Sequence, residues 1–287
     1  MTAEIISGKD IAQQIINDEL QPRVELLNKK GVQPKLVVIF VGDNPASQSY
    51  IRQKEKFATQ SGVFSEVRRF PDTMTEAELL AEIDDINNDD SIHGVIVQLP
   101  LPDGIDVNRV INAISPTKDV DGFTDSNNEN LDIHEAFLAP CTPKGIITLL
   151  DKTRVTIKDQ KVVVMGRSRI VGRPVAEMLK FRGANVTILH SKSTNTEKSS
   201  ALKKADILIV AVGKQELVHG EELSPGVVII DVGIHRKEDG KLCGDVHFDS
   251  CSSIASKITP VPGGVGPMTV VTLISNTIKA AEEKNKV

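Results

Sequence analysis

The chain of 287 residues has few members of several residue types, and each shortage excludes a class of protein. It has no tryptophan, one tyrosine and three cysteines, and Cys141, Cys243 and Cys251 show no C-x-x-C spacing. This pattern excludes a disulfide framework and the usual zinc motifs, and it favours a reducing compartment. The six histidines form no H-x-x-x-H pair, so the sequence predicts no metal site.

The chain also lacks a positive net charge, long basic runs and long apolar runs. The formal net charge is −5 and there is no long basic run, which argues against a nucleic-acid partner. No uninterrupted apolar stretch approaches the roughly 18 residues of a membrane-spanning helix, so we expect no membrane partner. The first residues, MTAEIISGKD, lack the charged and apolar regions of a secretory signal. We therefore expect a cytoplasmic protein.

Apolar runs of strand length alternate with helical patterns along the chain. Strands are predicted at 35–42, 63–69, 93–98, 161–165, 185–190, 206–211 and 227–231, and helices at 7–29, 75–88 and, more briefly, 106–113. Asn44 and Pro45 can cap and begin another helix, as can Thr142 and Pro143. Such alternation predicts parallel sheets with helices on their faces. We expect an α/β protein with two α/β domains, 1–140 and 141–266, and a final helix, 267–287, that packs onto the first.

The segment GRSRIVGRP, which follows the strand at 161–165, resembles a dinucleotide-binding turn. Gly166 and Gly172 supply backbone freedom, although Ser168 stands where G-x-G-x-x-G has its second glycine. Free N–H groups at the start of the next helix attract phosphate. Glycines alone are equally consistent with a tight connection that binds nothing. Three arginines in one turn, at 167, 169 and 173, favour an anion.

The next strand indicates which dinucleotide would bind. An NAD site has an Asp or Glu about twenty residues after the turn, on the ribose 2′-hydroxyl. This chain has His190, Ser191 and Lys192 there, and these residues would accept a 2′-phosphate that a carboxylate would repel. The sequence predicts an NADP site, with Arg167 and Ser191 on the 2′-phosphate.

Ser47, Tyr50 and Lys54 share one face of the predicted helix after Pro45, because they are spaced i, i+3 and i+7. The alternative is a surface lysine beside a tyrosine that covers the core. Short-chain dehydrogenases also use a Tyr and Lys pair, but theirs follows the glycine-rich turn, whereas this pair precedes it by more than a hundred residues.

Two further polar residues lie where ligands are common. Gln98 ends a predicted strand, at the edge where open α/β sheets bind ligands, although a glutamine at such a place more commonly satisfies loop backbone groups. Asp121 precedes a glycine in a turn, where it could bind a ligand or its own backbone. Asp119 we assign mainly to the turn.

Taken in order, these motifs resemble the methylenetetrahydrofolate dehydrogenase/methenyltetrahydrofolate cyclohydrolase family. The resemblance runs from about residue 35 to 275 and rests on SxxYxxxK, VQLPLP, KDVDGF, PCTPKG, GRSRIVGRP and TPVPGGVGPMT. It implies oxidation of 5,10-methylenetetrahydrofolate with NADP and hydrolysis of the methenyl product to 10-formyltetrahydrofolate. It also implies two α/β domains that flank a cleft, a Rossmann-like parallel sheet in the C-terminal one, and a homodimer.

Site residues are carried over by matching motif. The resemblance implies that Lys54, Gln98 and Asp121 are catalytic, with Tyr50 stacked on the folate ring and Asp121 on the pterin. A partly desolvated lysine can exchange a proton near neutral pH, and a neutral glutamine suits it better than a glutamate. The expected substrate contacts are Ser47, Tyr50, Gln98, Leu99, Asp121, Pro262 and Gly263. The expected cofactor contacts are Thr142, Gly166, Arg167, Ser168, Ile170, Val171, Ser191, Ile234, Gly264 and Thr269.

One stretch departs from the family pattern. The family commonly has DGFHPxNxG, where this chain has DGFTDSNNEN, and the change affects the loop at 124–130. A shikimate-dehydrogenase-like enzyme is the nearest rival, although the TPVPGGVGPMT segment and the Tyr50, Lys54 and Gln98 set argue against it. A regulator that binds NADP without turnover is a second alternative.

Overall fold

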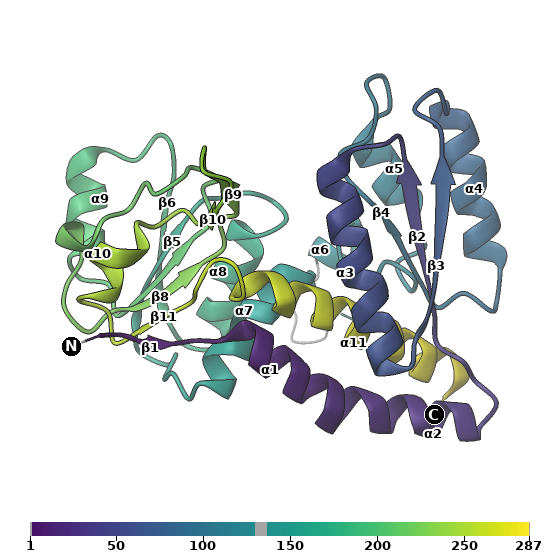
Figure 1. Ribbon diagram of the computed structural model, residues 1–287, viewed down its shortest axis with the longest axis horizontal. Helices are drawn as coiled ribbons and strands as arrows, with labels where there is room; N and C mark the ends of the chain where they lie inside the picture. Colours follow the sequence, from purple (N-terminus) through teal and green to yellow (C-terminus); the bar gives the residue numbers. More distant parts are fainter. Residues whose placement is uncertain (1, 130–136, 287) are drawn as a thin grey trace. The chain divides into compact units, whose positions relative to one another are not determined.

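The computed structural model describes residues 2–129 and 137–286, and the chain divides into two compact units. The six-stranded unit comprises Met1–Ala12 and Thr142–Thr269, and the three-stranded unit comprises Gln13–Cys141 and Val270–Val287. Figure 1 shows both as α/β structures, as the sequence predicted. The final helix, α11 (Val265–Asn285), contributes its first turn to the six-stranded unit and the rest to the three-stranded unit.

The six-stranded unit is built on one parallel sheet with the strand order β1-β11-β8-β7-β5-β6. Its strands are β1 (Glu4–Ile5), β5 (Lys161–Met165), β6 (Asn185–Leu189), β7 (Ile207–Val210), β8 (Val228–Asp231) and β11 (Lys257–Ile258). The helices are α7 (Cys141–Lys152), α8 (Gly172–Phe181), α9 (Asn195–Leu202) and α10 (Phe248–Ser252). A short antiparallel pair, β9 (His235–Arg236) and β10 (Leu242–Cys243), follows β8.

The β-branched runs of this unit explain its central sheet. All residues of β7 and β8 are buried, as expected for strands that helices cover on both faces. The sequence did not predict β1 or β11, because two residues carry no periodic signal. Pairing of β1 with β11 groups the first twelve residues with the six-stranded unit.

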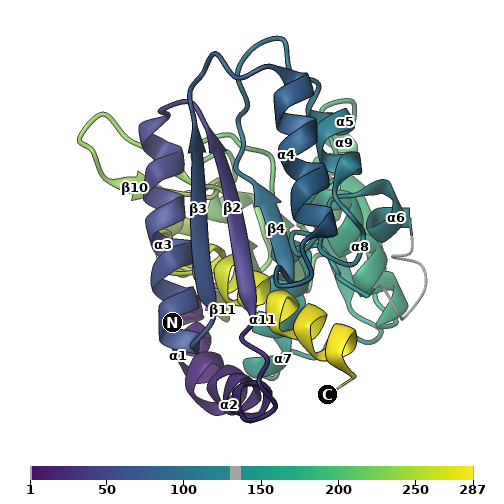
Figure 2. The same cartoon turned by 90° about the vertical axis from the view of Figure 1, so that its right-hand side faces the viewer.

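The three-stranded unit has a parallel sheet in the order β3-β2-β4. Its strands are β2 (Lys35–Val41), β3 (Phe64–Phe70) and β4 (Gly94–Val97), and its helices include α3 (Pro45–Ser61), α4 (Glu76–Asn88), α5 (Val107–Ala113) and α6 (Asp125–Glu129). Figures 1 and 2 show α3 and α4 on opposite sides of the strands. Buried residues of α4, α5, β2 and β4 form one apolar cluster.

Helix starts follow the capping signals in the sequence. The Asn44 side chain accepts the N–H of Ser47, so it caps α3 as predicted. The predicted helix at 7–29 is continuous but not uniform, since α1 (Gly8–Ile15) and α2 (Gln21–Lys29) are joined by a π-helical stretch, Ile16–Leu20. Over the described ranges, none of the helices is both long enough and apolar enough to cross a membrane.

Candidate active site

In the three-stranded unit, Lys54 and Gln98 are in direct contact. Lys54 lies on α3, and Gln98 follows β4 at the carboxyl end of the sheet. Nζ of Lys54 donates to Oε1 of Gln98 at 3.0 Å. The two residues are 44 positions apart in sequence, and parallel pairing of β2 with β4 brings them together. The structure therefore joins two of the three residues that we expected to be catalytic.

A second hydrogen bond fixes the orientation of the Gln98 amide. Its Nε2 donates to the carbonyl oxygen of Leu99 at 2.8 Å, and a carbonyl can only accept. Oε1 must then face Lys54. Ser47 is 3% exposed, and its hydroxyl donates to the same Leu99 oxygen at 3.2 Å. Ser47, Leu99, Gln98 and Lys54 therefore form one continuous hydrogen-bonded chain.

Tyr50 lies one turn before Lys54 on α3 and is 41% exposed. An aromatic ring of this size is usually buried for the most part, because burial of its apolar surface is favourable. Exposure of the only tyrosine beside the chain of polar contacts is what a stacking platform for a flat ligand requires. It also argues against the alternative in which this ring covers the core.

Asp121 lies within electrostatic reach of Lys54. Burial raises the pKa of the Asp121 carboxyl, and the positive charge of Lys54 acts in the opposite direction. The neighbouring charge of Asp119 raises the pKa of Asp121 further, whereas a hydrogen bond with Cys141 lowers it. The three expected catalytic residues thus interact within one unit, although they come from α3, the end of β4 and a loop.

The loop that holds Asp121 is built around Asp119, in agreement with the assignment of Asp119 to the turn. Asp119 is 1% exposed. Its Oδ1 accepts the N–H groups of Gly122 at 3.0 Å and Phe123 at 3.1 Å. Its Oδ2 accepts the N–H of Thr124 at 2.8 Å and Nδ2 of Asn127 at 2.9 Å. The aspartate before a D-G turn was the available signal, but its four donors become visible only in three dimensions.

Thr124, which departs from the family pattern, takes part in the same network, together with Asn127, which stands where that pattern also has an asparagine. Thr124 and Asn127 are buried, and the hydroxyl of Thr124 accepts the N–H of Asn127 at 3.3 Å. Asn127 also donates to the carbonyl of Pro116 at 3.0 Å. The departure from the family pattern at Thr124 therefore adds a hydroxyl acceptor to this network. Residue 130 of the departing loop lies outside the described residues.

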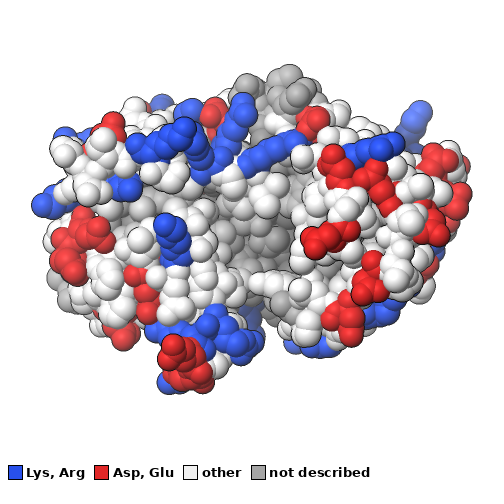
Figure 3. Space-filling view, turned by 90° about the horizontal axis from the view of Figure 1, so that it is seen from above, with Lys and Arg blue, Asp and Glu red and all other residues white. Residues whose placement is uncertain are grey.

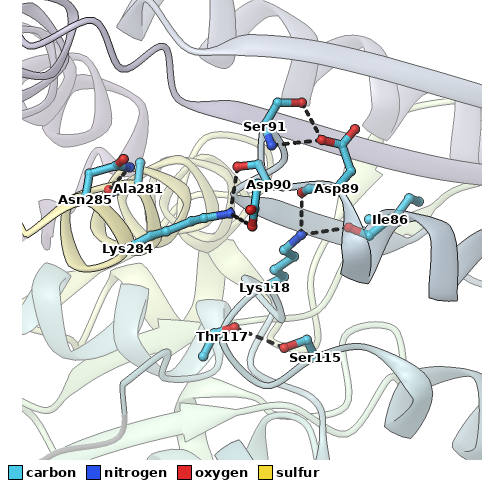
Figure 4. Close-up of polar contacts among 10 residues, drawn as sticks. All are labelled: Ile86, Asp89, Asp90, Ser91, Ser115, Thr117, Lys118, Ala281, Lys284 and Asn285. Atoms are coloured by element: carbon cyan, nitrogen blue, oxygen red, sulfur yellow. Dashed lines mark hydrogen bonds and ion pairs between the residues drawn. The ribbon is translucent and has the colours of Figure 1, made fainter.

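Lys118 anchors the start of the loop to α4, as Figure 4 shows. The side chain is 7% exposed, and Nζ donates to the carbonyls of Ile86 and Asp89 at 2.7 Å each. The last carbonyls of a helix lack partners and carry partial negative charge, so a cation there is stabilising. Lys284 of α11 bonds to the neighbouring Asp90 in the same view.

In the six-stranded unit, the turn after β5 is tightly constrained. Gly166 has φ +113, and a Cβ there would lie 2.2 Å from the carbonyl oxygen of Ala211. A Cβ on Gly172 would lie 2.2 Å from the carbonyl oxygen of Gly166. Only glycine fits either position. The turn therefore has no side chain at these two positions. It lies at the carboxyl edge of a parallel sheet, the place where α/β proteins bind nucleotides.

Ser168 bonds to the backbone at the start of α8, whose N-cap position is Val171. Its Oγ accepts the N–H groups of Val171 and Gly172 at 3.3 Å each, and its carbonyl accepts the N–H of Arg173 at 3.0 Å. These donors, which we expected to attract phosphate, thus have a partner in the chain itself. Ile170 is 40% exposed beside them and could pack against a ligand.

Strand register brings Arg167 and Ser191 to the same edge. Met165 pairs with Leu189, and the N–H of Gly166 donates to the carbonyl of Leu189 at 2.8 Å. Arg167 and Ser191 each come two residues after this pair, and both are exposed. Figure 3 shows Lys and Arg side chains gathered on the left-hand part of the surface, which belongs to this unit. The edge is suited to an anion.

The remaining expected cofactor residues come from three segments of this unit. The hydroxyls of Thr142 and Thr269 are 3.0 Å apart. α7 begins at Cys141, so its N-cap position is residue 140, and the expectation that Thr142 caps this helix was wrong by two residues. Ile234, after β8, is 43% exposed.

Pro262, Gly263 and Gly264 form the turn before α11. The carbonyl of Gly263 accepts the N–H of Lys9 at 2.9 Å. A Cβ on Gly264 would lie 2.5 Å from the carbonyl oxygen of Pro260, so only glycine fits there. At Gly263, φ is +102 and the nearest atom to such a Cβ would be 3.9 Å away, so this position needs glycine for its backbone conformation and leaves space beside the backbone.

Two family models together match most of the chain. Residues 6–121 match the catalytic domain of tetrahydrofolate dehydrogenase/cyclohydrolase, and residues 140–285 match the NAD(P)-binding domain of the same family. The chain is 50% identical to the bifunctional protein FolD of Moorella thermoacetica over 281 residues, which is 98% of this chain and 99% of the relative.

Solved structures agree with this match. The bifunctional FolD dehydrogenase/cyclohydrolase of Campylobacter jejuni has a TM-score of 0.94 at 42% identity, covering 99% of this chain and all of the other. The Trypanosoma brucei FolD, solved with NADP and an inhibitor, also has a TM-score of 0.94, at 36% identity and full coverage of both chains. A shikimate dehydrogenase from Thermus thermophilus shares the fold at a TM-score of 0.52 and 15% identity, with 87% of this chain and 99% of the other covered.

Proposed function

The chain belongs to the tetrahydrofolate dehydrogenase/cyclohydrolase family, and from this membership we propose which of its residues carry the two reactions. The protein is a bifunctional enzyme that oxidises 5,10-methylenetetrahydrofolate to the 5,10-methenyl form with NADP. It then hydrolyses the methenyl form to 10-formyltetrahydrofolate. The roles of single residues below are proposals.

Lys54 is the residue that we propose for hydrolysis, and its contact with Gln98 is the observation that carries the proposal. In hydrolysis, water adds to the methenyl carbon, the bond from that carbon to N5 breaks, and N5 takes one proton while a second is released. A lysine Nζ held beside the carbon can receive and return these protons. Gln98 has no charge, so it orients Nζ without stabilising the ammonium form as a carboxylate would.

The oxidation step makes different demands. The methylene carbon loses a hydride, and the electron pair on the neighbouring nitrogen forms the methenyl C=N bond. NADP, when bound, accepts that hydride, and no proton is transferred. The protein has only to hold the methylene carbon in line with the nicotinamide carbon that would receive the hydride. We therefore expect Lys54 to be dispensable for oxidation but essential for hydrolysis.

Tyr50 and Asp121 are proposed to hold the folate, together with Ser47, Leu99, Pro262 and Gly263. The exposed ring of Tyr50 offers a flat apolar surface to the pterin and aminobenzoyl rings. The two oxygens of Asp121 can accept paired N–H donors from the pterin edge. The hydrogen bonds that organise residues 119–127 hold the backbone of the loop that carries this carboxylate.

The NADP contacts are proposed for the six-stranded unit, and its residues fit the cofactor. The Gly166 turn, which has no side chain at that glycine, would hold the pyrophosphate. Arg167 and Ser191 would bind the 2′-phosphate, because they follow β5 and β6, which end side by side. Ile170, Val171 and Ile234 supply apolar contacts, and Ser168 shapes the turn by bonding to the backbone at the start of α8. Thr142, Thr269 and Gly264 complete the proposed set.

The decisive experiment compares Lys54→Met with wild type. Oxidation is followed through NADPH absorbance with 5,10-methylenetetrahydrofolate, and hydrolysis is followed through loss of methenyl absorbance in a separate assay. We expect the variant to oxidise its substrate and accumulate the methenyl form, with hydrolysis reduced by a factor of about 100 or more. Lys56→Met, an exposed lysine on the same helix, is the matched control and should hydrolyse normally.

Either of two results would contradict this assignment. Normal hydrolysis by Lys54→Met would remove Lys54 from the chemistry. Loss of oxidation and hydrolysis in equal measure would instead indicate that Lys54 binds the folate in both steps. A wild type that turns over neither substrate would revive the alternative of a regulator that only binds NADP.

We also propose that the enzyme is a cytoplasmic homodimer. β6 is the last strand of its sheet, and a groove of about 1010 Å³ lies along it, lined in part by Val186, Ile188 and Ala201. An edge strand of this kind can pair with a second copy. The three buried, free cysteines are consistent with a reducing compartment. Sedimentation equilibrium tests the dimer, and a mass of one chain at micromolar concentration would refute it.

A further inference from the structure

Asp245 is a fully buried carboxylate in the six-stranded unit, just after β10. It accepts the N–H groups of three consecutive residues: Val212 at 2.7 Å, Gly213 at 2.9 Å and Lys214 at 2.9 Å. Nε2 of His235 lies 2.7 Å from its Oδ1. A buried charge is tolerated only when it has such partners. Asp245 therefore fixes the loop after β7 and the start of β9 to a single point.

This point lies at the carboxyl edge of the sheet. The loop after β7 borders the loop after β5, because these strands are neighbours, and β8 lies on the other side of β7. Ligands of open α/β sheets bind along this edge. Asp245 itself is enclosed, so it cannot touch a ligand and can act only through the segments that it holds.

The loop turns its carbonyl groups away from Asp245. In a trans peptide the C=O points opposite to the N–H, so three N–H groups that converge on one carboxylate direct the carbonyls of residues 211–213 outward. The carbonyl of Ala211 faces the Gly166 turn, since it lies 2.2 Å from where a Gly166 Cβ would be. Among the described residues, no donor hydrogen-bonds to the carbonyl of Val212 or Gly213.

Strand order indicates which half of NADP would lie over this loop. The proposed 2′-phosphate contacts follow β5 and β6, so the adenosine half lies on the β6 side. With the pyrophosphate at the turn after β5, the rest of the dinucleotide would extend toward β7 and β8, which follow β5 in the strand order. Ribose hydroxyls and a carboxamide are hydrogen-bond donors, and they match a row of carbonyl acceptors.

A second buried carboxylate, Asp231, fixes the position of Asp245. Asp231 ends β8, is 2% exposed, and accepts the N–H groups of Gly233 at 3.0 Å, Asp245 at 2.9 Å and Val246 at 3.0 Å. A Cβ on Gly244 would lie 1.8 Å from Oδ2 of Asp231. The two carboxylates are thus enclosed by backbone that has no space for another side chain.

We propose that Asp245 is a positioning residue for the nicotinamide half of the cofactor. It aligns the carbonyls of 211–213 with the donors of that half. Through His235 it also holds the neighbouring Ile234, whose exposed side chain would offer an apolar contact to the nicotinamide ring. This inference rests on the proposed NADP site of the six-stranded unit.

The test uses the fact that the enzyme has two activities, because hydrolysis of methenyltetrahydrofolate can be assayed without nucleotide. In Asp245→Asn, the amide NH₂ replaces one acceptor and must face at least one backbone N–H. We expect the KM for NADP to rise about tenfold or more, with hydrolysis within twofold of wild type. Asp249→Asn, an exposed aspartate on α10, is the matched control and should change neither.

Three outcomes would overturn the proposal. One is an unchanged KM for NADP in Asp245→Asn, and another is an equal fall in oxidation and hydrolysis, which would indicate a merely structural role. If that variant does not fold, His235→Ala decides, because it leaves all three loop bonds intact and should still raise the KM for NADP with hydrolysis unchanged. An unchanged KM for NADP in His235→Ala is the third outcome that would overturn the proposal. Failure of the proposed function would look different, since wild type itself would lack NADP-dependent oxidation.

Discussion

Replacement of Asp119 by asparagine tests whether the loop around Asp121 is held by one buried carboxylate. The substitution keeps the size of the side chain and exchanges one oxygen for an NH₂ group. Each oxygen of Asp119 accepts two donors, Gly122 and Phe123 on Oδ1 and Thr124 and Asn127 on Oδ2. Whichever way the new amide points, two of these four hydrogen bonds are lost.

The expected cost follows from that count. Two donors are left buried without an acceptor, and each such donor costs about 1–3 kcal/mol, so the variant should lose roughly 2–6 kcal/mol of stability. That is a large share of the roughly 5–15 kcal/mol by which proteins are stable. A protein of this size should then melt roughly 5–20 °C lower.

The functional consequence concerns folate in both reactions. Asp121 lies inside the loosened loop, so the KM for methylenetetrahydrofolate and for methenyltetrahydrofolate should each rise about tenfold, which corresponds to about 1.4 kcal/mol. The KM for NADP should stay unchanged, because the cofactor residues lie in the other unit. Assays are run well below the melting temperature. Asp125→Asn, an exposed aspartate in the same loop, is the control and should behave as wild type.

The reasoning would be refuted by a variant that melts lower yet binds both folates with unchanged KM. In that case Asp119 would stabilise the loop without orienting Asp121. An unchanged melting temperature would refute the estimate of stability itself.

Two further predictions concern cofactor choice and pH. Arg167→Ala should raise the KM for NADP roughly 10- to 100-fold and leave the KM for NAD unchanged, because one charge-assisted hydrogen bond to the 2′-phosphate is lost; initial rates with both cofactors test this, Arg182→Ala serves as control, and an equal change for both would count against it. His93 is buried, accepts the N–H of Lys35, and burial lowers its pKa from 6.5 to about 4. Between pH 6.5 and 4 the unfolded chain binds a proton that the folded protein does not, so stability should fall with falling pH by up to about 3 kcal/mol. His93→Gln should flatten that fall in urea titrations at pH 7 and 4.5, and parallel curves would contradict the assignment.

Elements with a strong local signal could be predicted from the sequence. The runs at 35–42 and 161–165 are β-branched and apolar over a full strand length, and the capping role of Asn44 depends only on residues within three positions. Two-residue strands such as β1 and β11 carry no such signal, because pairing with distant segments defines them, and β1 and β11 pair with each other across more than 250 residues. The π-helical stretch in the first helix was equally invisible, since its apolar spacing is close to that of an ordinary helix.

In the candidate site, too, some features could be predicted from the sequence and others depend on contacts between distant segments. Motif order was sufficient to select Lys54, Gln98 and Asp121, and their chemistry was sufficient to suggest roles. Nothing in the sequence indicated that the Gln98 amide is oriented by the carbonyl of Leu99, or that Asp119 collects four donors. Both facts depend on which backbone groups turn toward a side chain.

The sequence by itself determined the alternation of strands and helices, the residue types available for proton transfer and phosphate binding, and the glycines that keep two turns bare. These follow from short-range preferences and from the chemistry of single side chains. Only the tertiary structure decided which distant segments share a carboxylate, as Asp245 joins the loop after β7 to His235. The reason is physical: a buried charge is stable only where several donors converge, and that convergence depends on packing between segments far apart in the chain.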